Sequence, residues 1–221
     1  MKSQDFDAYA DYKRFNTNVA STWDDALNEA LTCVAKSASS VTFLDFGCGD
    51  GKNFAHLVEK KGLASKNIYG VEVAESRVTR CQNIGWFNAR LIQPNSRLPY
   101  EDNSFDIINI MEVIEHIPCE QGRSTLRELR RVLRTDGVLL ISTPNYPIKR
   151  FYDFSDAIFH RKWERLRDDP THVTRLNEKK LRHLLEELFS RVESRPFKPG
   201  FLYLRFPHPF LLHKLFYFCQ A

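Results

Sequence analysis

A polar stretch with the residue types of a catalytic or metal-binding site follows an apolar run in the middle of the chain. Glu112, Glu115 and His116 are separated by three and four positions, so on a helix they would share one face. His116 could act as a base near neutral pH, and together with Glu115 it is our candidate for general-base catalysis. The two carboxylates and the imidazole, joined by His172 or His160, could instead coordinate Mg²⁺ or Mn²⁺. A third interpretation gives them a structural role, as a pocket wall and a helix cap.

The elements that must position this stretch are strands, and an earlier strand leads into a second group of chemically informative residues. The run Val41–Phe46 is short and apolar, as in a buried strand, and a helical pattern begins after Gly51. Between the two, glycines stand at alternate positions: Gly47, Gly49 and Gly51. Glycine permits positive φ and lets a ligand approach the backbone, while the helix start offers unpaired N–H groups. This arrangement is typical of a site for a nucleotide-like ligand.

The residues around the glycines narrow the choice of ligand. The dinucleotide fingerprint requires glycine at its sixth position, where this chain has Lys52. Asp45 precedes the first glycine, where a carboxylate would repel a pyrophosphate but could hold an ammonium group. The next apolar run, Ile68–Val73, delivers Glu72 about 20 residues after the last glycine, where an acid binds two ribose hydroxyls. The ligand therefore carries a ribose and a cation but no phosphate, which fits S-adenosylmethionine (SAM).

The stretch Leu44-Asp-Phe-Gly-Cys-Gly-Asp-Gly51 resembles the first motif of the class I SAM-dependent methyltransferases. Later stretches resemble that family in the same order: Gly70–Val73, Leu98–Asp106 and Leu129–Asn145. The resemblance is to the broad subgroup that includes ubiquinone-pathway O-methyltransferases, and it implies a polar contact to adenine from Asn95 or Ser96. The cofactor-binding residues that we expect are Asp45, Gly47, Cys48, Gly49, Gly51, Glu72, Val73, Asn95, Ser96 and Met111.

The resemblance implies methyl transfer from SAM, with oxygen on a small molecule, lipid precursor or sugar as the expected acceptor. Small-RNA 2′-O-methyltransferases share the Glu-x-x-Glu-His arrangement and a later His, so a metal-dependent RNA 2′-O-methyltransferase is the first alternative. The net charge of +4 is too small to indicate the basic stripe that phosphate binding requires. A non-catalytic interaction module with a SAM fold is the second alternative, and the intact glycines and acids argue against it.

The order of apolar runs and helical patterns predicts a single doubly wound α/β domain. Its Rossmann-like sheet is expected to have seven strands, mostly parallel with an antiparallel C-terminal strand. The resemblance implies a helical lid segment over residues 1–40, with Tyr9, Tyr12 and Arg14 as lid candidates; the alternative is that they are ordinary core and surface positions of an amphipathic helix. The SAM-binding domain is then predicted over residues 41–206.

Two irregular regions complete the predicted organisation. An aromatic and charged insertion at 145–176 follows the fifth strand and is our candidate acceptor-binding lid, with packing over the sheet edge as the alternative. The last two strands are predicted at 192–197 and 201–206, which leaves an apolar tail at 207–221. This tail interleaves aromatic and basic residues, so it could contact a membrane interface or a second copy of the chain, or pack against the domain.

Composition and sequence patterns restrict the class of protein and its location in the cell. Hydrophobic residues make up 43% and charged residues 27% of the 221 residues, as in globular rather than disordered proteins. The five cysteines show no C-x-x-C spacing, the N-terminus lacks the pattern of a signal peptide, and no apolar run reaches the ~18 residues of a spanning helix. We therefore expect a cytoplasmic protein, with peripheral membrane contact as an alternative.

Overall fold

The computed structural model describes residues 21–86, 88–167, 169–196, 205–206 and 208–221. The chain divides into two compact units. Unit 1 lies within residues 1–109 and 131–138, and unit 2 within residues 110–130 and 139–221. The lid candidates Tyr9, Tyr12 and Arg14 lie outside the described residues, so the predicted lid segment stays a prediction.

Seven strands form one mixed sheet in the order β3-β2-β1-β4-β5-β7-β6. Their bounds are β1 (Phe43–Phe46), β2 (Ile68–Glu72), β3 (Ala89–Leu91), β4 (Phe105–Met111), β5 (Leu133–Pro144), β6 (Arg191–Ser194) and β7 (Lys214–Gln220). β1 pairs in parallel with β2 and β4, and β2 with β3, whereas β6 and β7 are antiparallel. The predicted fold class is therefore confirmed. The strand order reverses between β1 and β4, and open α/β sheets bind ligands at the carboxyl ends of such strands.

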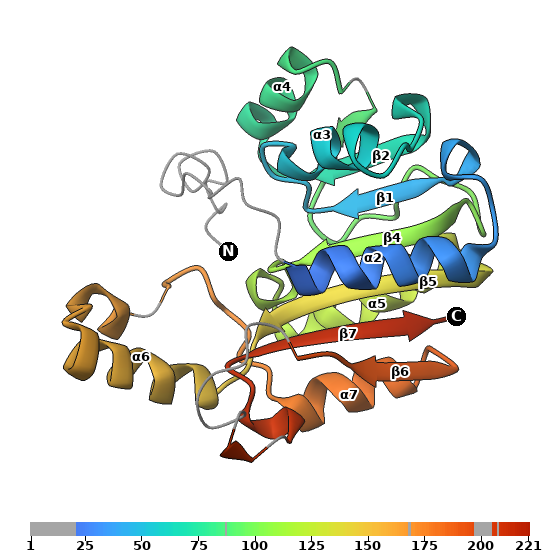
Figure 1. Ribbon diagram of the computed structural model, residues 1–221. Coiled ribbons are helices and arrows are strands. Elements are labelled where there is room, and N and C mark those ends of the chain that lie inside the picture. The colour runs from blue at the N-terminus through green and yellow to red at the C-terminus, as the bar shows by residue number, and fades with distance from the viewer. Residues whose placement is uncertain (1–20, 87, 168, 197–204, 207) are drawn as a thin grey trace. The chain divides into compact units, whose positions relative to one another are not determined.

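Unit 1 packs helices α2 (Ser21–Val34), α3 (Lys52–Glu59) and α4 (Glu75–Asn83) with the strands β1, β2 and β3, and short 3-10 turns lie at Ala38–Ser40 and Ser65–Asn67. Figure 1 shows β1 between β2 and β4. Phe43 and Leu44 of β1 and Ile107 and Ile108 of β4 have no exposed surface, because parallel strands are covered on both faces. This rigid centre carries the glycine turn that follows β1.

Unit 2 contains the 3-10 turn η3 (Ile114–His116), the greater part of helix α5 (Cys119–Val132), and helices α6 (Ile148–His160) and α7 (Glu178–Glu186). Further 3-10 turns are η4 (Trp163–Leu166) and η5 (Pro209–Leu211). Helix α7 follows the insertion at 145–176. Its N-terminus is capped by Asn177, whose side chain accepts the Lys180 N–H at 2.9 Å, and it buries Leu181 and Leu185 on one face.

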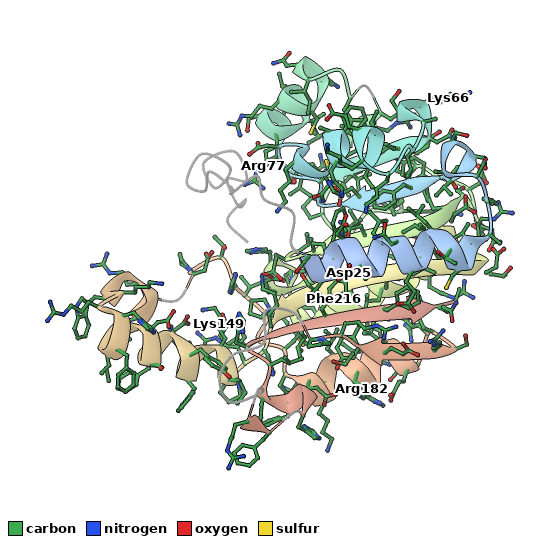
Figure 2. The ribbon with its side chains drawn as sticks, in the orientation of Figure 1. Asp25, Lys66, Arg77, Lys149, Arg182 and Phe216 are labelled. Atoms are coloured by element: carbon green, nitrogen blue, oxygen red, sulfur yellow. The ribbon has the colours of Figure 1, made fainter. Side chains whose placement is uncertain are left out.

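The predicted position of the final strand is wrong. β7 spans Lys214–Gln220, and its residues Leu215–Cys219 have no exposed surface; Figure 2 labels Phe216 among them. Of the strand predicted at 201–206, the two described residues are not in a strand. An uninterrupted apolar run is typical of a strand buried on both faces, so most of the apolar tail forms part of the core. The tail therefore does not supply the predicted membrane or dimer contact through β7. In the described part of the chain, no helix has both the length and the apolar character needed to cross a membrane.

Candidate functional site

The turn after β1 has the geometry that its glycines predict. Gly47, Gly49 and Gly51 all have positive φ, at 72°, 56° and 76°. The N–H groups of Gly47 and Cys48 both donate to the Val71 carbonyl, at 2.8 and 3.1 Å, which joins the turn to β2. Gly51 also lacks room for a side chain, since a Cβ there would lie 3.0–3.2 Å from three neighbouring side chains. Both the backbone and the packing therefore require glycine at this position.

Glu72 ends β2 with its carboxylate against the glycine turn. One oxygen, Oε2, accepts the Gly49 N–H at 3.0 Å, and Oε1 accepts the Val73 and Ala74 N–H groups at 2.7 and 3.2 Å. Arg77 of α4, labelled in Figure 2, places its guanidinium 3.9 Å from Oε2. The side chain is only 6% exposed, so three backbone donors and a cation fix the carboxylate beside the turn.

Asp45 is buried in a network of side-chain amides. Its two oxygens accept N–H groups from Asn53 and Asn109, at 3.0 and 2.7 Å, and the Asn109 oxygen accepts the Trp23 indole N–H at 2.7 Å. Burial raises the pKa of the Asp45 carboxyl, although the two amides act in the opposite direction. This network thus joins β1 to α2, α3 and β4. The sequence interpretation identified Asp45 but missed the other three residues of the network, although Asn109 is a polar residue inside an apolar strand.

The other expected cofactor-binding residues have different surroundings. Cys48 is buried. Its hydrogen bond with Cys81 and, as the second cause, its burial raise the pKa of its thiol well above the ordinary value, so the thiol stays protonated. Val73 is partly exposed after β2. Asn95 is exposed with φ of 56°, and the Ser96 hydroxyl donates to the Gln93 carbonyl at 2.7 Å. Met111, the last residue of β4, is partly exposed in unit 2.

The Glu-x-x-Glu-His stretch in unit 2 does not form the α-helical face that its spacing predicts. Glu112 has a positive φ of 57°, and Glu115 and His116 lie in the 3-10 turn η3. The Glu112 carboxylate accepts the Ser142 hydroxyl at 2.7 Å and pairs with the Lys214 ammonium at 2.7 Å. The helical-face interpretation is wrong because a left-handed residue interrupts any regular helix before Glu115.

Glu115, His116 and His172 come together in unit 2. Their ligand atoms lie within 4.8 Å of one another, and the two imidazole rings meet edge to face with centroids 4.9 Å apart. His116 Nδ1 lies 3.0 Å from the Thr171 carbonyl, and His172 Nδ1 lies 2.9 Å from the Tyr146 hydroxyl. A carbonyl can only accept, so His116 carries a proton on Nδ1 and its Nε2 is the basic nitrogen. His160 ends α6, is exposed, and does not belong to this group.

The two glutamates of this stretch have opposite electrostatic environments. Burial raises the pKa of Glu115 well above its ordinary value, and the neighbouring Glu112 charge raises it further. Burial acts on Glu112 in the same direction, but the Lys214 ammonium and the Ser142 hydroxyl outweigh it and lower the pKa. Glu115 Oε2 accepts the Thr143 hydroxyl at 3.0 Å, whereas the buried Oε1 has no hydrogen-bond partner among the described residues. Glu112 therefore holds the charge, and Glu115 is protonated unless a cation approaches it.

Comparisons with known proteins agree with this geometry. A family model described as a methyltransferase domain matches residues 15–188. A probable S-adenosylmethionine-dependent methyltransferase of Mycobacterium tuberculosis is 34% identical over 103 residues, which cover 46% of this chain and 35% of that protein. A ubiquinone biosynthesis O-methyltransferase of Hydrogenovibrio crunogenus is 27% identical over 121 residues, or 52% of this chain and 48% of that protein.

A solved structure is similar over nearly the whole chain. The crystal structure of a SAM-dependent methyltransferase from Archaeoglobus fulgidus has a TM-score of 0.61 and 19% identity, and the match covers 91% of this chain and 95% of that one. At this identity the likeness shows the fold alone. The matches to the two curated relatives span less than half of each relative's own length.

Proposed function

The chain belongs to the family of SAM-dependent methyltransferases, and from that premise we propose that it methylates an oxygen atom of a small molecule, lipid precursor or sugar. SAM is its cofactor and the chain is an enzyme. The observation that carries the proposal is the group formed by Glu115, His116 and His172. An oxygen acceptor must lose a proton before or during methyl transfer, and this group contains the basic nitrogen for that step.

The cofactor-binding role proposed for unit 1 rests on Glu72 and the glycine turn. A carboxylate fixed at the end of β2 is suited to accept the hydroxyls of a ribose. Gly49 brings its backbone to the same carboxylate, which allows a ligand to approach the main chain closely. Asp45 accepts one amide N–H on each of its oxygens, from Asn53 and Asn109, and these bonds fix the carboxylate at the start of the turn. Each oxygen can accept a second hydrogen bond, so Asp45 positions the turn and keeps its predicted role as a partner for the ammonium group.

His116 is the proposed base. The Thr171 carbonyl fixes the tautomer of its ring, so Nε2 is the atom that receives the acceptor's proton. Glu112 stays ionised beside Lys214, and its charge interacts with His172, whose ring contacts His116 edge to face. Methyl transfer from a sulfonium needs little further chemistry, because the donor is already activated and alignment in a dry pocket is the enzyme's main contribution.

The same residues also fit a divalent cation. Glu115 Oε1 is buried without a hydrogen-bond partner among the described residues, and a cation would replace the proton that its raised pKa retains. Two imidazoles and one carboxylate suit a transition ion such as Mn²⁺ better than Mg²⁺, which prefers oxygen ligands. Glu115, His116 and His172 would hold the ion, whereas Glu112 is engaged by Ser142 and Lys214. A bound cation would lower the pKa of an acceptor hydroxyl.

A paired acceptor assay tests the proposal. The full chain is incubated with SAM and with hydroxylated quinone precursors, phenols, sugars and a short RNA duplex. Each acceptor is matched by a counterpart whose hydroxyl is blocked, and S-adenosylhomocysteine and product are measured by mass spectrometry. Turnover that requires the free hydroxyl supports the proposal, and the active acceptor class separates small molecules from RNA. Methylation that persists on the blocked counterparts would show a carbon or nitrogen acceptor instead.

The cation is tested separately by thermal unfolding. Mn²⁺ should raise the Tm of the wild-type chain and EDTA should reverse the rise, because an ion that binds only the folded state stabilises it. Glu115→Gln should abolish the rise, while Glu120→Gln, an exposed acid in the first turn of α5, should retain it. An equal change of Tm in all three proteins would show that Glu115 does not bind the cation, and His116 would then be a base that acts without metal.

A further inference from the structure

Helix α6 presents its large apolar side chains to solvent. Its exposed large side chains are Phe151 (50%), Phe154 (58%), Ile158 (47%) and Phe159 (75%). Their spacing places them on one side of the helix, whereas the buried positions are Asp153 and Ala157 on the opposite side. A surface helix of a globular protein has the reverse pattern, with apolar residues facing the core. The outer side of α6 is therefore suited to contact with an apolar medium.

The apolar surface continues from α6 onto η4, against which α6 packs. Trp163 and Leu166 of η4 are 60% and 37% exposed. In Figure 1, α6 runs outward from the end of β5 and away from β6, β7 and α7 of the same unit. The exposed aromatic side chains of α6 and η4 thus do not pack over the sheet edge, whereas Tyr146 of the same insertion is buried. Six large apolar side chains on two adjoining elements form a patch of the kind that marks an interaction site.

The exposed charges that the structure describes around this patch are positive. Among the described side chains of residues 148–167, the exposed charged ones are Arg161, Lys162 and Arg167, whereas Asp156 is partly exposed. Asp153 is buried and pairs with Lys149 at 2.7 Å, so its charge is compensated within the helix. Aromatic residues beside lysine and arginine are typical of helices that lie in the interface of an anionic bilayer.

We propose that α6 and η4 form a docking surface for an anionic lipid bilayer. The apolar side chains of the two elements enter the boundary between headgroups and acyl chains, and the three cations contact lipid phosphates. This contact would hold the enzyme where apolar acceptors partition. The proposal is independent of the reaction, because vesicle binding requires neither SAM nor an acceptor.

The test is flotation of the full chain with phosphatidylcholine vesicles, with and without phosphatidylglycerol. The wild-type chain should float with the anionic vesicles, and added salt should weaken this binding. The double variant Phe154→Glu/Phe159→Glu should lower the partition coefficient by about tenfold or more, since two apolar anchors become acidic. Arg161→Gln/Lys162→Gln should lower it by about tenfold or more on anionic vesicles alone, at about 1 kcal/mol for each cation.

A matched control is available at the C-terminus. Phe206→Glu/Phe210→Glu removes two phenylalanines that are 59% and 46% exposed and adds the same charge, yet it should float as the wild type does. All the substituted side chains are exposed, so unchanged melting curves should confirm folding. Flotation of the Phe154/Phe159 variant at the wild-type level would overturn the proposal, and so would failure of the wild type to float with either vesicle. Self-association without vesicle binding, lost in that variant, would assign the surface to a second copy of this chain.

Discussion

Replacing Glu72 by glutamine should weaken SAM binding by about 10- to 100-fold. The carboxylate accepts three backbone N–H groups, from Gly49 on one oxygen and from Val73 and Ala74 on the other. Glutamine has one oxygen and an NH₂ group that cannot accept, so in either orientation at least one backbone N–H faces another donor. The orientation that keeps the bonds from Val73 and Ala74 leaves the Gly49 N–H without an acceptor. Leaving this donor unsatisfied should lower the free energy of unfolding by about 1–3 kcal/mol.

The effect on affinity has a separate origin. A ribose hydroxyl that donates to a carboxylate contributes about 1.5–3 kcal/mol, and this contact exists only in the bound state. Since 1.4 kcal/mol corresponds to tenfold, its loss predicts a Kd higher by about 10- to 100-fold. The two losses can be distinguished because urea unfolding without SAM reports the first and calorimetric titration with SAM reports the second.

The matched control is Glu75→Gln, which makes the same chemical change at an exposed acid in the first turn of α4. It should leave both the unfolding free energy and the Kd for SAM close to those of the wild type. A Glu72→Gln protein that unfolds more easily but binds SAM with wild-type affinity would refute the ribose assignment. In that case the carboxylate would only order the glycine turn.

Three further changes test other parts of the site. Because burial raises the pKa of Glu115, the folded state should lose stability as the pH rises through that raised pKa, and Glu115→Gln should remove this loss in urea titrations with EDTA present. Asn109→Ala should lower the unfolding free energy by about 2–6 kcal/mol in urea, since Asp45 and Trp23 each lose a buried partner. Gly51→Ala should lower the Tm and cost about 1–3 kcal/mol, because φ is 76° and the Cβ would lie 3.0–3.2 Å from neighbouring side chains.

The glycine turn and the acid after β2 could be predicted from the sequence because both are local features. Strand, turn and helix are adjacent in the chain, and their φ requirements restrict the residue types at each position. The amide network was not predictable in this way. Asn109 is 64 positions from Asp45 and 86 positions from Trp23, so only the folded topology brings them together. A polar residue in a doubly buried strand indicates that a partner exists, but it does not identify that partner.

The prediction for the Glu-x-x-Glu-His stretch was wrong about local structure, and only part of the predicted metal group lies together. His172 lies beside Glu115 and His116, whereas Glu112, the second carboxylate of the metal interpretation, does not belong to this group. The role of Glu112 could not be derived, because its partner Lys214 begins β7, which the sequence interpretation placed too early in the chain. One error in strand position thus concealed the cation that keeps Glu112 ionised.

The insertion after β5 contributes to two proposed functions without coupling them, because its ends are tied together. The Tyr146 hydroxyl lies 2.9 Å from His172 Nδ1, and the Tyr146 N–H donates to the Leu176 carbonyl at 2.8 Å. These bonds hold His172 beside Glu115 and His116. The outer surface of α6 and η4, which lie between Tyr146 and His172 in the chain, can therefore change without displacing the His172 imidazole. The Phe154→Glu/Phe159→Glu variant should therefore lose vesicle binding and keep the Mn²⁺-dependent rise in Tm, whereas Glu115→Gln should show the opposite behaviour.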